Sequence, residues 1–154
     1  MKLAALLDKE SIILPLKAKN RFEAIKKLLE GVDRAYDYVD ATELLDVLES
    51  REHEMPTVLG NGIFFPHERI ETLDDFVVVF GISPDGIPDE KAEDEPIKFS
   101  FLIVCPFEKN SLMLKTRAAF LNLLLNEHNF KALLRAKNSI AALRIIEKSN
   151  IDVR

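Results

Sequence analysis

The chain contains three histidines, and His67 is the one whose position most favours chemistry. It follows Pro66 directly after the apolar residues 63–65, and α/β proteins often place functional side chains at such strand ends. A neutral imidazole there could act as a general base, a metal ligand or a nucleophile. His53 and His128 lie in charged or polar segments, so we expect both at the surface.

The sequence lacks the partners that general-base or zinc chemistry would need. No Gly-x-Ser-x-Gly elbow supplies a nucleophile, and no two further zinc ligands occur at a recognisable spacing. A nucleophilic histidine would instead need groups that stabilise transferred charge. Arg51 and Thr57 lie upstream, and Gly60 and Gly62 allow backbone N–H groups to approach an anion. Taken singly, Arg51 also fits a solvated helix end, and the glycines fit a plain turn.

A second nucleophile and a nucleotide site are both disfavoured. Cys105 could accept a phosphoryl group at a strand end if amides and hydroxyls followed it, but Pro-Phe-Glu-Lys follows. We therefore expect Cys105 to be a small buried apolar residue. The sequence lacks the usual motifs of nucleotide- and dinucleotide-binding folds, Gly-x-x-x-x-Gly-Lys-Ser/Thr and Gly-x-Gly-x-x-Gly.

Composition and length set the broad class of protein. The 154 residues fit one domain over 1–154, and the formal charge of −5 argues against a non-specific nucleic-acid binder. One cysteine excludes a disulfide framework. No apolar run is long enough to span a membrane, and the apolar start ends too early for a signal peptide. We therefore expect a cytoplasmic protein without membrane insertion.

The hydrophobic pattern predicts an α/β domain with a mixed β-sheet sandwiched by helices. Strands are expected at residues 11–17 (an edge strand), 63–65, 76–82 and 97–105, with a loop or hairpin over 83–95. Asn20 and Asp40 are expected to cap two helices, the first stopping at Gly31 and the second running to about Glu52. A deeply buried helix is expected over residues 112–125. Two shorter helices should follow, capped by Asn126 and by Asn138 or Ser139.

Residues 51–67 carry a recognisable arrangement of Arg51-Glu52, Thr57, Gly60-Asn61-Gly62, an apolar strand and Pro66-His67. This segment resembles the active-site segment of the fructose/mannitol-type enzyme IIA domains of the bacterial phosphotransferase system, which include the nitrogen-regulatory enzyme IIA proteins. The resemblance extends over nearly the whole chain and implies the fold of that family. It also suggests a free-standing domain.

The resemblance implies a phosphocarrier. His67 would accept a phosphoryl group from a histidine-containing phosphocarrier protein and pass it to a IIB domain, or retain it as a mark read by a regulatory target. Arg51 could fork onto the phosphoryl oxygens, Thr57 could bond the phosphate or orient the ring, and amides around Gly60 and Gly62 would complete the cradle. No metal or other cofactor is required, because the donor is another protein's phosphohistidine.

One departure from the family pattern leaves alternatives open. The family usually has a second histidine at the start of the long helix, where this chain reads Met113-Leu114. Met113 cannot donate a hydrogen bond to a phosphoryl group, and Lys115 is expected on another face of the helix. The alternative is a non-transferring interaction module with the same fold. A metal hydrolase that uses His67 is a third and weaker hypothesis.

Three aromatic residues also have two interpretations. Phe64, Phe65 and Phe107 could form a docking patch for a partner, because exposed aromatic clusters often mark such sites. They could equally belong to the core, which is the commoner case.

Overall fold

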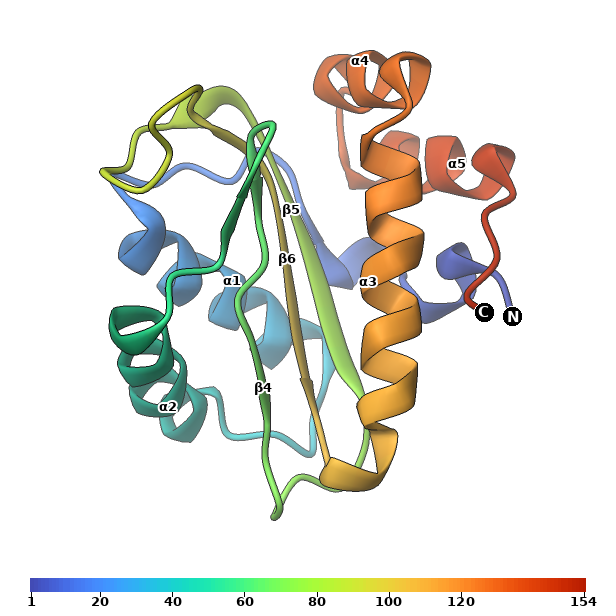
Figure 1. Cartoon of the computed structure of the whole chain (residues 1–154). Helices are drawn as coiled ribbons and strands as arrows, with labels where there is room; N and C mark the ends of the chain where they lie inside the picture. Colours follow the sequence, from blue (N-terminus) through green and yellow to red (C-terminus); the bar gives the residue numbers. More distant parts are fainter.

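A six-stranded mixed sheet forms the centre of the computed structural model, which describes residues 1–154 (Figure 1). Its strands are β1 (Ile12–Ile13), β2 (Val58–Gly60), β3 (Ile63–Phe64), β4 (His67–Arg69), β5 (Val77–Ile87) and β6 (Ile97–Cys105). The strand order is β1-β5-β6-β3-β2, and β4 pairs with β6 beyond the end of β3. The pair β5–β6 is antiparallel, whereas β1, β3 and β4 each run parallel to a long strand. The predicted mixed sheet is confirmed, and the edge strand predicted over residues 11–17 is present but limited to Ile12–Ile13.

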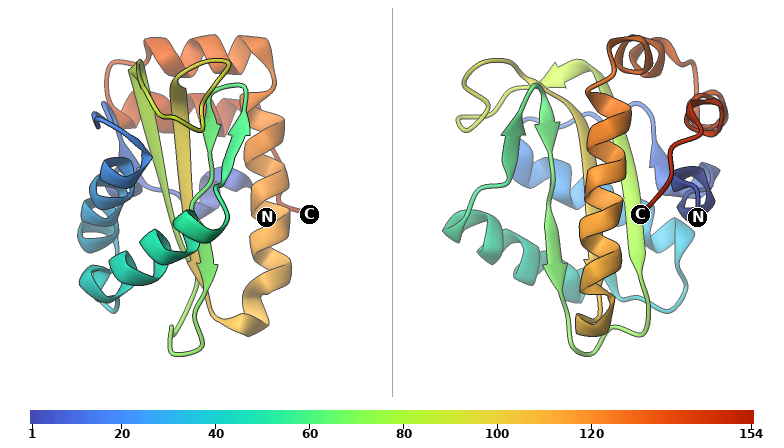
Figure 2. Two further views of the ribbon diagram at one scale, coloured as in Figure 1. Left: turned by 60° about the vertical axis from the view of Figure 1, so that its left-hand side comes forward. Right: turned by 45° about the vertical axis from the view of Figure 1, so that its right-hand side comes forward.

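Helices cover both faces of the sheet, as predicted (Figures 1 and 2). One face carries α1 (Arg21–Ala35) and α2 (Ala41–Glu54). The other carries α3 (Asn110–Leu124), α4 (Glu127–Arg135) and α5 (Ser139–Ser149). The 3₁₀ segments are η1 (Leu3–Leu6), η2 (Lys9–Ser11) and η3 (Phe107–Lys109). Every helix is too short or too polar to cross a membrane.

Alternation along the strands divides the core into two layers. On β6, Phe101 and Ile103 belong to the cluster beneath α3, α4 and α5, whereas Leu102 and Val104 belong to the cluster beneath α1 and α2. Successive side chains of a strand point to opposite faces, so one long strand serves both layers. The two long strands β5 and β6 are therefore covered on both faces along most of their length and support the shorter strands at the edge of the sheet.

The predicted caps are confirmed. Four side chains each accept a hydrogen bond from a backbone N–H in the first turn of their helix: Asn20, Asp40, Asn126 and Asn138. Each cap satisfies a donor that the helix itself leaves unpaired. These helix starts were predictable because capping depends only on neighbouring residues.

Gly31 does not stop the first helix, contrary to the prediction. α1 continues through it to Ala35, and a Cβ at Gly31 would lie 2.8 Å from Ile13 Cδ1 and 3.0 Å from Val79 Cγ1. The glycine therefore serves close packing of α1 on the sheet rather than helix termination.

Two further predictions were wrong in part. Strand β5 continues beyond residue 82 to Ile87, which pairs with Ile97 after an irregularity near Gly86, where φ is +78°. The long helix α3 is not buried on all sides, because Leu114 is 53% exposed. α3 is an outer layer with one face on the sheet, so Leu114 on its outer face meets solvent.

Candidate functional site

His67 lies at the edge of the sheet, immediately after a break in the strand path. The pairs Phe64↔Ser100 and His67↔Ile103 show that β3 and β4 follow β6 as two segments. Pro66 lies between them and has no backbone N–H to donate to a ladder. The predicted strand therefore does not end before His67 but resumes there, and the imidazole is half-buried at the rim.

The hydrogen bonds of the His67 ring assign its two nitrogens. Nδ1 lies 2.9 Å from the carbonyl oxygen of Phe65, and Nε2 lies 3.1 Å from Nη2 of Arg51. Because a carbonyl can only accept, Nδ1 carries the proton, and Nε2 presents a lone pair to the guanidinium. The ring also stacks on Phe65 with centroids 4.1 Å apart, which holds its orientation.

The surroundings keep this imidazole neutral. Burial lowers the pKa of His67, and the positive charges of Arg51 and Arg117 lower it further. The hydrogen bond to the Phe65 carbonyl and the charge of Glu68 act in the opposite direction, but the net shift in pKa is downward. A neutral ring with an unprotonated Nε2 is the nucleophilic form of histidine.

Arg51 comes from the last turn of α2 and has donor capacity to spare. Its Nη2 contacts His67, and its Nη1 lies 3.9 Å from Oε2 of Glu68. Its Nε is buried and has no hydrogen-bond partner. Buried donors normally have partners, so Nε of Arg51 is an unsatisfied donor beside His67.

Thr57 is close to the site but its hydroxyl is engaged elsewhere. The backbone N–H of Thr57 donates to Glu52 Oε1 at 2.9 Å, and the hydroxyl donates to Glu52 Oε2 at 2.7 Å. Glu52 is almost fully buried and also accepts from Nε of Arg21 at 2.9 Å. Thr57 thus anchors the start of β2 beside Phe65, whose N–H donates to the Thr57 carbonyl.

Glu52 belongs to the Arg51-Glu52 element of the recognised segment, but its burial and its partners were not predicted. It lies in the charged run Arg51-Glu52-His53-Glu54, which is typical of a solvated helix end. Its partner Arg21 is 31 positions away and also pairs with Asp89 at 2.8 Å. Long-range ion pairs of this kind leave no local pattern.

Gly60 and Gly62 lie at the tip of the β2–β3 hairpin, away from His67. Both have positive φ, +89° and +74°, and Asn61 between them has φ +54°. Ile63 pairs with Phe99 while His67 pairs with a residue four positions further along β6. Gly62 is therefore roughly 16 Å from His67 along the strand, so the structure does not bring the glycines to the imidazole. The two glycines form a plain turn, which was the other interpretation of these residues.

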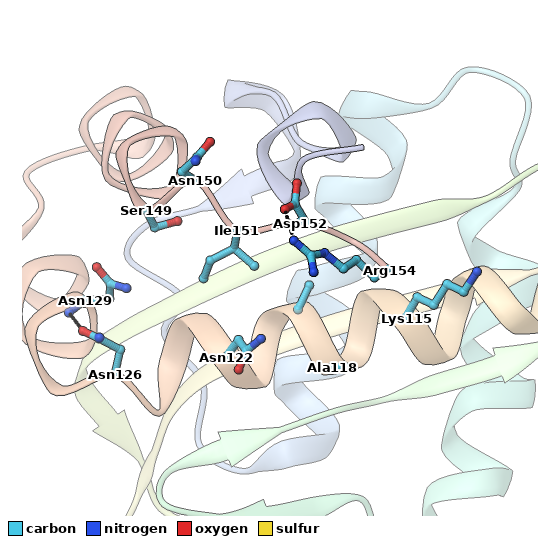
Figure 3. A pocket seen from close by; sticks show the side chains of 11 residues that line it. Lys115, Ala118, Asn122, Asn126, Asn129, Ser149, Asn150, Ile151, Asp152 and Arg154 are labelled. Carbon is cyan, nitrogen blue, oxygen red and sulfur yellow. Dashed lines mark hydrogen bonds and ion pairs between the residues drawn. The ribbon is translucent and has the colours of Figure 1, made fainter.

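The long helix places the remaining candidates on different faces. Met113 is buried in the core, so its side chain does not reach solvent beside His67. Lys115 lines an open polar groove beside the C-terminal segment (Figure 3). This agrees with the prediction that Lys115 lies on another face of the helix than Met113. Arg117, whose charge affects His67, was not singled out in the sequence because its significance depends on how α3 is placed on the sheet.

The other sequence predictions near the site have clear outcomes. Cys105 is buried, as predicted, and burial raises the pKa of its thiol. Phe64 and Phe65 belong to the core, whereas Phe107 is exposed. His53 is exposed and stacks on Phe22. His128 is also exposed.

Metal chemistry finds no support in the arrangement of side chains. No three His, Cys, Asp or Glu side chains are grouped so that they could hold a metal ion. The charged groups around His67 are instead Arg51, Arg117 and Glu68, of which two are cations.

This combination of fold and site defines a class of protein. Residues 5–149 match the family described as "Phosphoenolpyruvate-dependent sugar phosphotransferase system, EIIA 2". The chain therefore belongs to this family, as the resemblance in residues 51–67 predicted.

Curated relatives agree with this assignment. The chain is 31% identical over 115 residues to the "PTS system fructose-specific EIIA component" of Haloferax volcanii, covering 75% of each chain. It is 28% identical over 148 residues to the fructose-specific EIIABC component of Bacillus subtilis. That match covers 96% of this chain but only 23% of the relative, so the chain spans about a quarter of that longer protein.

Solved structures share the fold. The mannitol IIA of Escherichia coli superposes with a TM-score of 0.75 at 26% identity, covering 91% of this chain and 98% of that chain. The same IIA in a complex with phosphorylated enzyme IIB gives a TM-score of 0.76 at 24% identity, covering 92% and 97%. The nitrogen regulatory protein IIA-Ntr of Neisseria meningitidis gives 0.80 at 14% identity, covering 94% and 98%. These likenesses confirm the predicted enzyme IIA fold.

Proposed function

We propose that the chain is a phosphocarrier that accepts a phosphoryl group on Nε2 of His67. The observation that carries this proposal is the pairing at His67: Nδ1 is held by the Phe65 carbonyl, and Nε2 offers its lone pair beside Arg51. Membership of the EIIA 2 family supports a transfer role in the phosphotransferase system.

The transfer step needs neither a metal nor a general base. The Nε2 lone pair forms a bond to phosphorus, while the N–P bond of a donor phosphohistidine breaks and its electron pair returns to the donor ring. The proton on Nδ1 of His67 remains in place, because the Phe65 carbonyl stabilises the positive charge that the phosphorylated ring develops. Such transfers depend mainly on positioning and charge stabilisation.

Arg51 is the principal group for charge stabilisation. Its Nη2 must move from the Nε2 lone pair as the phosphoryl group arrives, and can then donate to a phosphoryl oxygen. The unpartnered Nε provides a second donor on the same planar group. A guanidinium can thus bind two oxygens at once, which a lysine could not do in the same geometry.

Thr57 acts in this proposal through position rather than by contact with phosphate. Its hydroxyl is bonded to the buried Glu52, the residue that follows Arg51 on α2. Glu52 therefore ties the end of α2 to the start of β2, and β2 in turn contacts Phe65. This network keeps Arg51 and the His67 ring in register.

The proposed partners are proteins of the same transfer chain. A histidine-containing phosphocarrier protein would be the donor, and a IIB domain or a regulatory target would receive the group or read it. The IIB proposal is supported by the mannitol IIA complex with phosphorylated enzyme IIB. Such a chain of phosphoproteins would place this protein in the cytoplasm.

Radiolabelled phosphoenolpyruvate, enzyme I and the histidine phosphocarrier protein test the proposal directly. The protein should acquire an acid-labile label, and His67→Ala should acquire none, whereas the matched control His53→Ala should label normally. Label on a residue other than His67 would refute the site.

A non-transferring module remains the second candidate, favoured by Met113. That residue is buried and gives the site no hydrogen-bond donor at the position of the family's second histidine. Absence of label on the native chain, under conditions that label a genuine enzyme IIA, would support this candidate over the phosphocarrier.

A further inference from the structure

We propose that Arg117 of α3 supplies a second guanidinium for the phosphoryl group on His67, opposite Arg51. This inference rests on the proposed phosphocarrier function and adds a binding residue to the same site. Arg51 reaches His67 from α2, which covers one face of the sheet, whereas α3 covers the other. The phosphoryl group would then lie between cations from opposite helical layers.

A ladder of stacked aromatic rings fixes the height of α3 along the sheet. Phe65 stacks on Phe101 with centroids 4.6 Å apart, and Phe101 stacks on Phe120 at 4.5 Å. All three residues are buried. Phe120 of α3 therefore lies level with Phe101 of β6.

His67 lies further toward the start of α3 than this ladder. It pairs with Ile103, which is two strand residues, or about 7 Å, beyond the ladder residue of β6. α3 returns antiparallel to β6 (Figure 1), and about 7 Å of helix corresponds to between about four and five residues. Counting back four to five residues from Phe120 places Thr116 and Lys115 at the height of His67. Arg117 is the neighbour of Thr116 and lies about 1.5 Å further along the helix, within reach of a long side chain.

The rotation of α3 places Arg117 on the appropriate flank. Thr116 is fully buried against the sheet. Each helical residue turns by about 100°, so Lys115 and Arg117 leave α3 on opposite sides of Thr116. Lys115 faces the groove beside the C-terminal segment (Figure 3), and Figure 2 (right) shows that segment and the strands β3 and β4 on opposite sides of α3. Arg117 therefore leaves on the side of His67.

The charge and freedom of Arg117 fit this role. Like Arg51, it lowers the pKa of His67, after the larger effect of burial. Its side chain is exposed and takes part in none of the ion pairs of the structure. The guanidinium is thus free to turn toward an anion, with no competing carboxylate to displace.

The test uses a small phosphoryl donor so that partner binding does not enter. The native protein, Arg117→Gln, Arg117→Lys and the matched control Lys115→Gln are phosphorylated with phosphoramidate, and the phosphoryl group is titrated by ³¹P NMR. Arg117→Gln should raise the pKa of the phosphoryl group by about 0.5, the size expected for one charge removed at about 6 Å in water. Lys115→Gln should leave it unchanged, and Arg117→Lys should retain most of the native value.

Transfer from the histidine phosphocarrier protein provides the second readout. Arg117→Gln should lower the rate of this transfer by about tenfold, which is the smallest effect expected when a charge-assisted hydrogen bond is lost. An effect on protein-to-protein transfer with an unchanged phosphoryl titration would overturn the proposal, since Arg117 would then serve docking. Identical behaviour of Arg117→Gln and Lys115→Gln would refute the inference while leaving the phosphocarrier function intact. Failure of the native His67 to accept from either donor would refute the function itself.

Discussion

Nη2 of Arg51 lies 3.1 Å from Nε2 of His67, although the two residues belong to a helix and to the edge strand that it packs against. The contact orients the guanidinium toward the atom that we propose to be the nucleophile. It also defines the resting state, in which a cation occupies the place that a phosphoryl group would take.

Replacement of Arg51 should therefore impair transfer more than stability. Arg51→Gln should lower the single-turnover rate of phosphoryl acceptance by about tenfold to a hundredfold, because a charge-assisted bidentate contact is lost. Removing this positive charge should also raise the pKa of His67, which an NMR titration of the ring protons would show. The exposed Arg34 provides a matched control, and Arg34→Gln should change neither quantity. An unchanged rate in Arg51→Gln would contradict the role assigned to Arg51.

The lowered pKa of His67 should make stability depend on pH. An unfolded chain binds a proton on this histidine near pH 6.5, whereas the native ring does so only at lower pH. The contribution of His67 is therefore complete above pH 6.5 and is lost as the pH falls through its native pKa. Urea unfolding at pH 7.5 and pH 5 should show a smaller acid-induced loss of stability in His67→Gln than in the native protein. His53→Gln, which changes an exposed histidine, is the reference variant. If the native protein and His67→Gln lost the same free energy of unfolding on acidification, the ring of His67 would not be held neutral by the fold.

The hydrogen bonds that Glu52 accepts from Thr57 and Arg21 should contribute mainly to the stability of the fold. Thr57→Val removes a hydrogen bond to a buried carboxylate and should cost about 2 kcal/mol in the free energy of unfolding. Glu52→Gln also removes the charge facing Arg21 and should cost about 3 kcal/mol. Denaturant unfolding measures both values. A Thr57→Val protein of native stability that transfers as poorly as Arg51→Gln would show that the hydroxyl contacts the phosphate after all.

The hairpin glycines should prove structural. Gly62→Ala forces a side chain onto a positive φ and brings its Cβ within 3.1 Å of the Pro96 carbonyl oxygen, so it should cost about 1–2 kcal/mol. Gly60→Ala meets open space and should cost less, since only backbone strain remains. Acceptance rates, corrected for the folded fraction, should be native in both variants. A large loss of the phosphoryl-acceptance rate in folded Gly60→Ala would show that the hairpin takes part in phosphate binding after all.

Local patterns predicted the parts of the fold that depend on neighbouring residues. Asn20, Asp40, Asn126 and Asn138 cap helices because the donors they satisfy lie two or three positions away. Gly31 was misjudged because its role is set by contacts with β1 and β5, far away in the chain. A glycine that ends a helix and a glycine that lets one pack closely look alike in a single sequence.

The candidate site was predictable to the same extent. His67 and Arg51 follow from a segment of 17 residues whose order resembles a known family, and the structure brings these two together. Thr57 and the glycines belong to the same segment, but the Thr57 hydroxyl is bonded to Glu52, and strand register separates the glycines from the imidazole. Glu52 and Arg117 depend on burial and on helix rotation, which no spacing in the sequence reports.

The most direct test of the central claim is to identify the atom that carries phosphate. Protein labelled with ¹⁵N in histidine, phosphorylated by the carrier protein, should show one shifted imidazole in an NMR spectrum that correlates ring nitrogens and protons. The pattern should be that of a phosphate on Nε2 of His67, with Nδ1 still protonated and bonded to the Phe65 carbonyl. A phosphate on Nδ1, on another residue, or on no residue would contradict the account.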